Sequence, residues 1–440
     1  MTELTDHLWD RYGRLTLDDL PADVVTVVHH CILDWFGCTL AGSSEPLAAI
    51  LRDELAADAG PCSIIGTRRR ADALRAALIN GAAGHALDFD DTSPVMGAHA
   101  TVPLLPAVLA LAQEQGRSGA DLVTAYAVGM EVQARIGASI GREHYAKGWH
   151  TTSTIGVFGA AAASSRLLDL DNERFGAAMG IAASNASGLK ANFGTMTKPL
   201  HAGQAAERGM LAARLAARGY TANAEAVDGN QGLAQAAGAG ALDRSGLDDW
   251  ADRWATPSTL FKYHAACHLT HAGIEATSSI LADGVDPAAV ERVTLTVHPA
   301  ILDVCGIPEP TTGLEAKFSL RGTQALLLNG IDTAAVTTFG DEPINRPDVQ
   351  ATVPKVLVET DPSMAAMATM VEVATADGVR RRHHDVSRPS DDLADQGARL
   401  RRKFEALAGP VVGGDEAAVM ADRLGEVSTI GTVDELVARS

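Results

Sequence analysis

Aromatic residues are scarce in this chain, since Trp, Tyr and Phe supply only 4% of its 440 residues. Sites that hold a carbocation depend on several aromatic faces, so this composition disfavours them. Glycine, by contrast, occurs 42 times, and alanine is abundant. This mixture is typical of closely packed helices, in which small side chains allow two backbones to approach each other.

Basic residues are in deficit as well: 36 Lys and Arg stand against 55 Asp and Glu, which gives a net charge of −19. An acidic surface repels nucleic acid and anionic membranes, so we expect neither as a partner. A small anionic substrate would therefore need a local basic pocket.

Cysteine is too sparse and too scattered for a disulfide framework. The chain has five cysteines and no CxxC pair, which favours a reducing, cytoplasmic location. Residues 1–7 show no basic stretch followed by an apolar run, so no signal peptide is expected. We also expect no apolar run of membrane-spanning length.

The spacing of apolar residues predicts that most of the first 260 or so residues are helical. One helix begins at Leu20-Pro21 and closes near Gly42. Asp72 has the side chain expected of an N-cap for the next helix, over residues 72–83. Further helices are predicted over residues 103–113, 119–137, 155–168 and 177–186.

The character of the chain changes beyond about residue 285. Apolar and β-branched runs at 290–297, 355–359 and 368–375 predict strands, and a turn follows at Asp377-Gly378. Helical patterns return at 391–407, 417–424 and 433–438.

These patterns predict a mainly α fold in three segments. A helical domain spans residues 1–262, an α+β insert spans 263–392, and a helical tail over 393–440 rejoins the first domain.

The segment GHALDFDDT, residues 84–92, is rich in acids. On a helix, His85, Asp88 and Thr92 would share one face and could line a pocket. Three other interpretations stay open: solvated acids at a helix end, the DxDxT motif of haloacid-dehalogenase-type phosphatases, and the DxDD acid of some terpene cyclases. The phosphatase motif must follow a buried strand, whereas the residues before His85 look helical. The cyclase needs many aromatic residues, and this chain has few.

Two histidines and a lysine stand out further along the chain. His99 lies seven residues after Thr92, and His150 precedes a run of hydroxyl residues. A lone histidine is more often structural than catalytic. Lys198 lies just before a helix of small residues, where it could help to cradle a carboxylate. A solvated lysine is the alternative.

Residues 261–272 contain three histidines and a cysteine. On a helix, His264, Cys267 and His271 would share a face, with His268 beside them. Zinc is one interpretation, although no HExxH motif and no obvious fourth ligand are present. The others are acid/base groups, with Lys262 binding an anion, and a plain polar helix face.

Taken together and in order, these segments resemble the MmgE/PrpD family, which contains 2-methylcitrate dehydratase, cis-aconitate decarboxylase and iminodisuccinate epimerase. The matching pieces are DWFGCTLAG at 34–42, GHALDFDDT at 84–92, KPLHAGQAAERG at 198–209 and KFSL at 317–320, together with His150 and residues 262–271. The resemblance implies a large helical domain formed by both chain ends, a smaller α+β lid domain, a homodimer, and no metal or organic cofactor.

The resemblance also implies which residues line the pocket: Asp88, Thr92, His99, His150, Lys198 and Lys262. Where the family often has Pro-Tyr after Phe-Ser-Leu, this chain has Arg321-Gly322, so a phenol is absent and Arg321 adds a cation. Where the family often has His-Pro-Ser, this chain has His99-Ala100-Thr101.

The implied function is that of a cofactor-independent lyase, which dehydrates or decarboxylates a small di- or tricarboxylate by proton transfer next to a carboxylate. The expected catalytic residues are Asp88, His99, His150 and Lys198, and the expected substrate-binding residues are Thr92, Lys262, His268 and Arg321. His85, Asp90 and Asp91 are expected to be mainly structural. An isomerase or epimerase with the same pocket, and a non-catalytic relative, are the alternatives.

Overall fold

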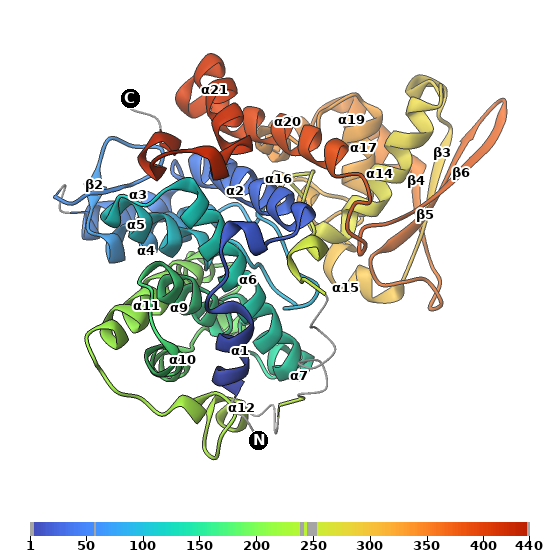
Figure 1. The fold of residues 1–440 in the computed structure, drawn as a ribbon. Helices are drawn as coiled ribbons and strands as arrows, with labels where there is room; N and C mark the ends of the chain where they lie inside the picture. The colour runs from blue at the N-terminus through green and yellow to red at the C-terminus, as the bar shows by residue number, and fades with distance from the viewer. Residues whose placement is uncertain (1–3, 57–58, 238–241, 244–252, 438–440) are drawn as a thin grey trace. The chain divides into compact units, whose positions relative to one another are not determined.

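The computed structural model describes residues 4–56, 59–237, 242–243 and 253–437 (Figure 1). By its internal contacts the chain divides into two compact units. The first contains Met1–Phe261 together with Ser390–Ser440, and the second contains Lys262–Pro389. The described residues are mainly helical, as the sequence predicts.

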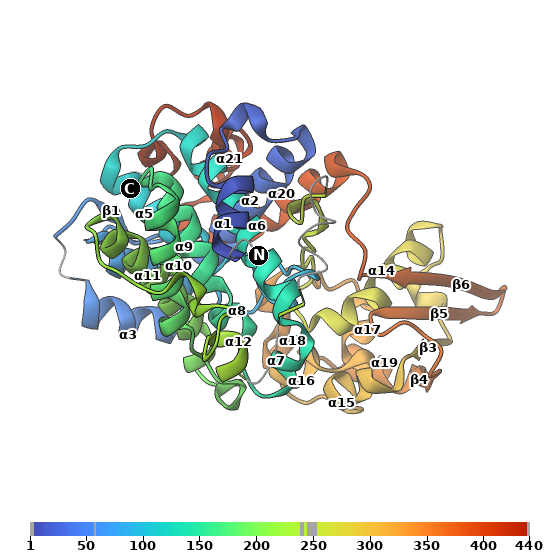
Figure 2. The ribbon, with the colours of Figure 1, turned by 60° about the horizontal axis from the view of Figure 1, so that its bottom comes forward.

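The first unit is built from helices, and Figures 1 and 2 show α9, α10 and α11 side by side within it. A two-stranded ladder of β1 (Cys62–Ser63) and β2 (Arg70–Ala71) is its sheet among the described residues. The helices are α1 (Leu4–Tyr12), α2 (Ala22–Gly42), α3 (Pro46–Leu55), α4 (Ala73–Gly84), α5 (Leu105–Gln115), α6 (Gly119–Ile140), α7 (Arg142–Ala146), α8 (Thr151–Thr154), α9 (Gly156–Leu167), α10 (Asn172–Asn185), α11 (Thr197–Ala217), α12 (Leu233–Ala236), α20 (Leu393–Val412) and α21 (Gly414–Gly425).

The predicted helices of this unit are confirmed, with shifts of a few residues at their ends. Asp72 caps α4 as expected, because its side chain accepts hydrogen bonds from the backbone N–H groups of Leu74 and Arg75. The stretch predicted as a helix at 433–438 is instead a short 3₁₀ turn over Val433–Leu436.

Helix α2 is buried along most of its length. By length and mean hydropathy it could cross a membrane, so the expectation that no apolar run reaches that length is wrong. However, 78% of its most apolar window is buried within the protein, as in the core helix of a folded domain.

Helices α4 and α11 approach each other at two glycines. A Cβ atom at Gly203 would lie 2.2 Å from the carbonyl oxygen of Leu78, and one at Gly81 would lie 2.7 Å from the Cα atom of Gly203. Neither position has room for a side chain. This contact fixes the spacing between the C-terminal end of α4 and the N-terminal turn of α11, and residues of the candidate active site lie at both places.

The second unit is a four-stranded sheet with helices around it. The strands have the order β4–β3–β5–β6, in which β3 and β4 are parallel and the other neighbours are antiparallel. The strands are β3 (Arg292–Val297), β4 (Val356–Thr360), β5 (Ala368–Thr375) and β6 (Gly378–Asp385), and the helices are α14 (His268–Ala282), α15 (Leu302–Cys305), α16 (Gly313–Lys317), α17 (Leu320–Leu328), α18 (Asp341–Ile344) and α19 (Pro347–Thr352).

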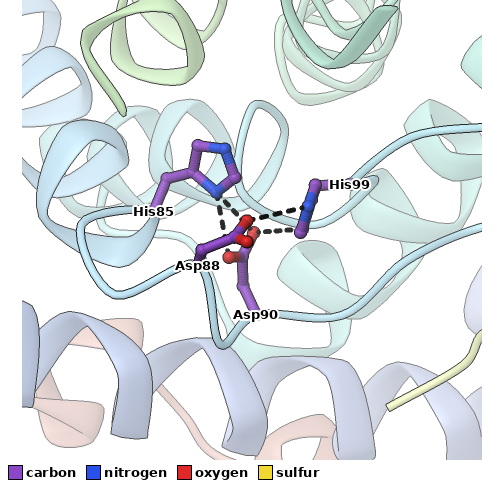
Figure 3. Close-up of side chains that lie close together, drawn as sticks. All are labelled: His85, Asp88, Asp90 and His99. Atoms are coloured by element: carbon purple, nitrogen blue, oxygen red, sulfur yellow. Dashed lines mark hydrogen bonds and ion pairs between the residues drawn. The ribbon is translucent and has the colours of Figure 1, made fainter. Parts of the chain in front are cut away.

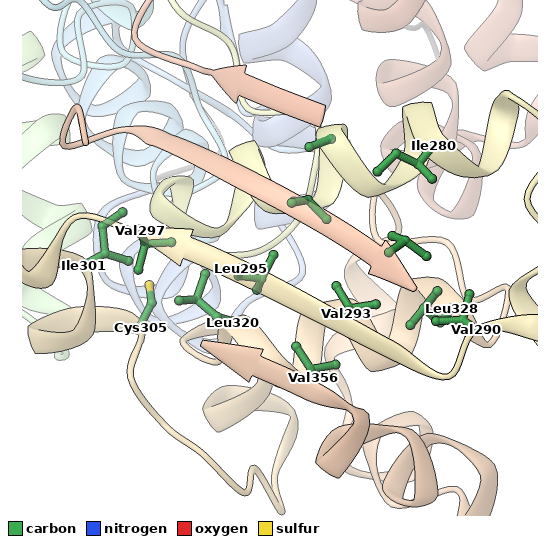
Figure 4. Packing of buried hydrophobic residues seen from close by; sticks show 13 residues of the cluster. Ile280, Val290, Val293, Leu295, Val297, Ile301, Cys305, Leu320, Leu328 and Val356 are labelled. Atoms are coloured by element: carbon green, nitrogen blue, oxygen red, sulfur yellow. The ribbon is translucent and has the colours of Figure 1, made fainter. Parts of the chain in front are cut away.

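The core of the second unit lies on one face of this sheet (Figure 4). Val293, Leu295 and Val297 alternate along β3 and are fully buried, which is the period of a strand with one face toward a core. Three of its strands are confirmed from the sequence. Strand β6 was not predicted, because its residues are mostly charged and exposed, as is common at the edge of a sheet.

Candidate active site

The acidic segment after α4 forms a loop, so the expectation of one helical face is wrong. Helix α4 ends at Gly84, and Asp88 takes a left-handed backbone conformation with φ of 52°. Thr92, at the far end of the loop, forms a backbone bridge with Leu260 through hydrogen bonds of 2.9 and 2.8 Å. His85, Asp88 and Thr92 are therefore placed by a loop and not by a helical repeat.

Asp90 is fully buried in this loop and faces two imidazole rings (Figure 3). Its carboxylate lies 2.9 and 3.1 Å from Nδ1 of His85 and 2.9 Å from Nδ1 of His99. Burial opposes the charge of Asp90, but the two histidines outweigh it and hold the pKa of this carboxyl well below its usual range. Asp90 is therefore ionised; it accepts from Nδ1 of His85 and lies at ion-pair distance from His99.

His85 is the buried partner in this arrangement. Burial lowers its pKa to about 4, although Asp90 acts in the opposite direction. The ring of His85 is therefore neutral at pH 7. Since Asp90 can only accept, the proton of this neutral ring lies on Nδ1.

Asp88, Lys198 and His99 form the more open side of the cluster. The Nζ atom of Lys198 donates a 2.7 Å hydrogen bond to Oδ1 of Asp88, and Nε2 of His99 lies 3.3 Å from the same oxygen. The three side chains are 49%, 18% and 12% exposed, in the order Asp88, Lys198, His99. Lys198 lies in the first turn of α11, where the helix N-terminus adds positive potential. An anion that reaches this point meets an ammonium and an imidazole.

His150 lies next to the rings of His85 and His201. It is stacked on His85 with ring centroids 6.0 Å apart, and its Nδ1 lies 3.2 Å from Nδ1 of His201. Burial, with help from the positive charges of its neighbours, lowers the pKa of His150 to about 2. The ring of His150 is therefore neutral throughout the range in which the protein would work.

A buried lysine from the C-terminal part of the chain contacts the loop that carries Asp88 and Asp90. Lys403, on α20, places its Nζ atom 2.5 Å from Oδ1 of Asp34 and 2.7 Å from the carbonyl oxygen of Phe89. The same ammonium lies 3.9 Å from the centre of the Phe89 ring. Burial opposes the charge of Lys403, but the attraction of Asp34 outweighs it and raises the pKa of Lys403. Phe89 separates Asp88 from Asp90, so this contact holds both carboxylates in place.

Asp91, in the same loop, has partners that lie outside the group of histidines. Its carboxylate accepts from the backbone N–H and the hydroxyl of Thr101, and that hydroxyl also contacts the phenol of Tyr126 at 2.5 Å. Asp91 therefore fastens the loop to the segment that comes after His99.

The remaining predicted residues belong to the second unit, where the expected helix over 264–271 is also wrong. Helix α14 begins at His268, so His264 and Cys267 lie in the loop before it. His264 contacts the hydroxyl of Thr333 at 2.8 Å and the carboxylate of Glu275 at 3.1 Å, which gives it a structural role in this unit.

Lys262 begins the second unit and is buried, with 4% of its surface exposed. The loop after it is tied to α16 by a 3.0 Å hydrogen bond from the backbone N–H of Cys267 to the carbonyl of Lys317. His268 opens α14 and Arg321 lies in the first turn of α17, and both are partly exposed.

In the part of the chain that the structure describes, one group of donors is close enough to hold a metal ion. These atoms belong to His85, Asp88, Asp90 and His99 and lie within 4.8 Å of one another. Asp90 already faces two imidazole nitrogens, and Asp88 already faces the ammonium of Lys198. A cation would compete with Lys198 and would require both rings to release their Nδ1 protons. The contacts therefore fit a proton-transfer network better than a metal centre.

The structure thus brings together Asp88, His99, His150 and Lys198 from the predicted set. It adds three residues that the sequence did not single out as functional: Asp90, His201 and Lys403. Asp90 was visible as a member of the acidic motif, but its partner His99 comes from another segment. No local pattern could have joined Lys403 to Asp34, since 369 positions separate them.

Comparisons with known proteins identify the family of the chain. Family models of the MmgE/PrpD N-terminal domain and the MmgE/PrpD C-terminal domain match residues 8–244 and 264–424. The chain is 33% identical over 320 residues to cis-aconitate decarboxylase of Mus musculus, which covers 69% of this chain and 65% of that protein. It is 30% identical over 370 residues to cis-aconitate decarboxylase of Aspergillus terreus, which covers 77% and 74%.

A third relative is the cis-aconitate decarboxylase-like protein oryM of Aspergillus oryzae, with 32% identity over 309 residues, 66% of this chain and 64% of that protein. The chain thus covers less than two thirds of the length of the oryM protein and of the mouse protein.

Proposed function

Because the chain belongs to the MmgE/PrpD family, we propose that it is a lyase that removes CO₂ from a small di- or tricarboxylate. The relatives at 30–34% identity are cis-aconitate decarboxylases or resemble them, which favours decarboxylation over dehydration. The chemistry that we propose draws on side chains of the chain alone.

The observation that carries this proposal is the contact of Lys198, Asp88 and His99 at the partly exposed side of the cluster. A carboxylate substrate needs a fixed cation, and Lys198 supplies one in a protein with a net charge of −19. The reaction also needs a proton donor beside that cation, and His99 lies against the same Asp88 oxygen.

In the proposed reaction, the bond between carbon and one carboxylate group breaks and CO₂ leaves. The electron pair of that bond stays on the substrate as a carbanion, delocalised toward a neighbouring carboxylate. Lys198 stabilises the charge that develops there. A protonated His99 then gives its proton to carbon, and solvent returns a proton to the ring. His150, which is neutral, would act as a hydrogen-bonding partner and not as an acid.

The roles of the other implied residues are part of the proposal. Thr92, Lys262, His268 and Arg321 would hold further polar groups of the substrate, and Arg321 would replace the phenol that other family members often have. We also propose that the protein is a homodimer, which light scattering on the purified protein would test.

The test is a ¹H NMR screen in D₂O with cis-aconitate, citrate, 2-methylcitrate and iminodisuccinate. We expect one of these to lose CO₂ and to gain one deuterium on carbon, at the same rate with and without a chelator. Loss of water would identify a dehydratase. Deuterium exchange without net loss would identify an isomerase or epimerase, and binding without turnover would identify a non-catalytic relative.

Two variants would test the assignment of residues. Lys198→Ala and His99→Ala should each reduce turnover by on the order of 100-fold, because each removes a group that acts on developing charge or on the proton. Lys190→Ala is the matched control: this lysine also lies in the first unit, but it contacts Tyr145. Near-normal turnover in both Lys198→Ala and His99→Ala would contradict the assignment.

A further inference from the structure

His99 is the one ring in the cluster that lies between two carboxylates. Its Nδ1 is 2.9 Å from Asp90, and its Nε2 is 3.3 Å from Asp88. A neutral imidazole has a single N–H, so it could donate to only one of them and would turn a lone pair toward the other. With a proton on each nitrogen, the ring is positively charged and presents an N–H toward each of the two carboxylates.

From this geometry we propose that Asp90 is a positioning residue, which fixes the orientation of His99 and keeps that ring protonated until Nε2 gives its proton to the substrate. The proposal rests on the proposed lyase function for the step in which the proton is used. The proposed protonation of the His99 ring does not depend on that function.

The surroundings of His99 favour this assignment. Asp88 and Asp90 contact the ring, and the buried Asp91 adds a weaker attraction from farther away. Lys198, on the same Asp88 oxygen, and His150 are nearby groups that oppose the charge of His99. His85 is the second ring on Asp90, 4.5 Å from His99 between centroids, and its neutral state adds no charge. The backbone N–H of His99 donates to the hydroxyl of Thr152, which holds the residue from a third side.

A doubly protonated His99 also fits the difference in exposure between the two carboxylates. Asp90 has 1% of its side chain exposed and cannot leave, whereas Asp88 is 49% exposed and shares its oxygen with Lys198. A substrate carboxylate that takes Lys198 would displace Asp88 from Nε2, while Asp90 would still hold Nδ1. The proton on Nε2 would then face the substrate.

Asp91, in the same loop, is a carboxylate with a structural role and serves for comparison with Asp90. It is equally buried, but its partners are the backbone and hydroxyl of Thr101. The partners of Asp90 in the structure are two imidazole rings. Asp91→Asn is therefore the matched control for Asp90→Asn.

The experiment is a pH titration of the histidine rings by NMR in protein labelled at histidine, with His99 assigned from the spectrum of His99→Gln. In the wild-type protein we expect the His99 ring to carry both protons at pH 7. In Asp90→Asn we expect its titration midpoint to fall by about one pH unit or more. Asp91→Asn should move the midpoint much less, because the charge of Asp91 acts on His99 without contacting the ring.

Turnover supplies the second measurement. For Asp90→Asn we expect kcat to fall at least about 10-fold with little change in KM. We also expect the alkaline limb of the pH profile to move to lower pH, because the ring must be protonated to react. A purely structural Asp90 would lower stability without moving that limb.

Three outcomes would overturn the inference: a neutral His99 in the wild-type protein at pH 7, an unchanged midpoint in Asp90→Asn, or an equal shift in Asp91→Asn. If Asp90→Asn does not fold, the wild-type titration still decides. If no carboxylate is turned over but the midpoint behaves as expected, the proposed function fails and the role of Asp90 stands.

Discussion

Replacement of Lys403 by methionine should weaken the fold and disable the cluster together. The side chains of Lys403 and Asp34 are 3% and 1% exposed, so the variant would leave Asp34 as a buried acid without its cation. Removal of one partner from a buried pair costs about 3–5 kcal/mol. Loss of the hydrogen bond to the carbonyl of Phe89 adds about 1–3 kcal/mol.

The expected loss is therefore about 4–8 kcal/mol, which is a large share of the about 5–15 kcal/mol that stabilises a typical protein. Urea unfolding followed by far-UV circular dichroism would measure it through the helices of the first unit. Arg401→Met is the control on the same helix. Because Arg401 is 42% exposed, loss of its ion pairs with Glu405 and Asp422 should cost about 1 kcal/mol or less.

A double variant separates stability from activity. Asp34→Leu combined with Lys403→Met removes both charges, so most of the lost stability should return. Turnover should stay low, because the carbonyl of Phe89 still lacks the donor that holds Asp88 and Asp90 in place. If Lys403→Met unfolds within about 1 kcal/mol of the wild type, or if the double variant recovers full turnover, the reasoning is refuted.

Two further predictions concern packing and pH. Gly203→Ala should cost about 1–3 kcal/mol in urea unfolding and should lower turnover, because its Cβ atom would lie 2.2 Å from a backbone oxygen of α4. Gly409→Ala is the control, because Gly409 also lies within a helix and a Cβ atom there would meet open space. Burial lowers the pKa of His30, His85 and His144 to about 4 in the folded protein. In the unfolded chain these rings take up a proton already as the pH falls below about 6.5. The free energy of unfolding should therefore decrease between pH 7 and pH 5 by about 1–2 kcal/mol for each ring, and a flat profile over this range would contradict the assigned neutral state.

The sequence was most informative where structure is local. Periodicity predicted α2, α5, α6 and α9, and the carboxylate of Asp72 predicted the start of α4, since both signals depend on neighbours within one helix. The order of short motifs along the chain predicted the family correctly. That prediction needed no contact between the motifs.

The sequence was least informative about the loops that carry the chemistry. Helical spacing suggested one face for His85, Asp88 and Thr92, but α4 ends at Gly84 and long-range contacts shape the loop after it. Asp90 depends on His99, and Phe89 depends on Lys403. Tertiary partners of this kind override local propensity, and a single sequence does not reveal them.

The pair between Asp34 and Lys403 also has a consequence for synthesis. A ribosome adds the 369 residues between them at about 5–20 residues per second, so α2 waits roughly 20–70 s for its partner. During that time α2, the most apolar helix of the described chain, carries Asp34 without the lysine that pairs with it in the folded protein. The second unit is continuous in sequence, so all of its residues are made before α20. The first unit is completed only when α20 emerges, so a nascent chain should need protection from aggregation until its last helices are made.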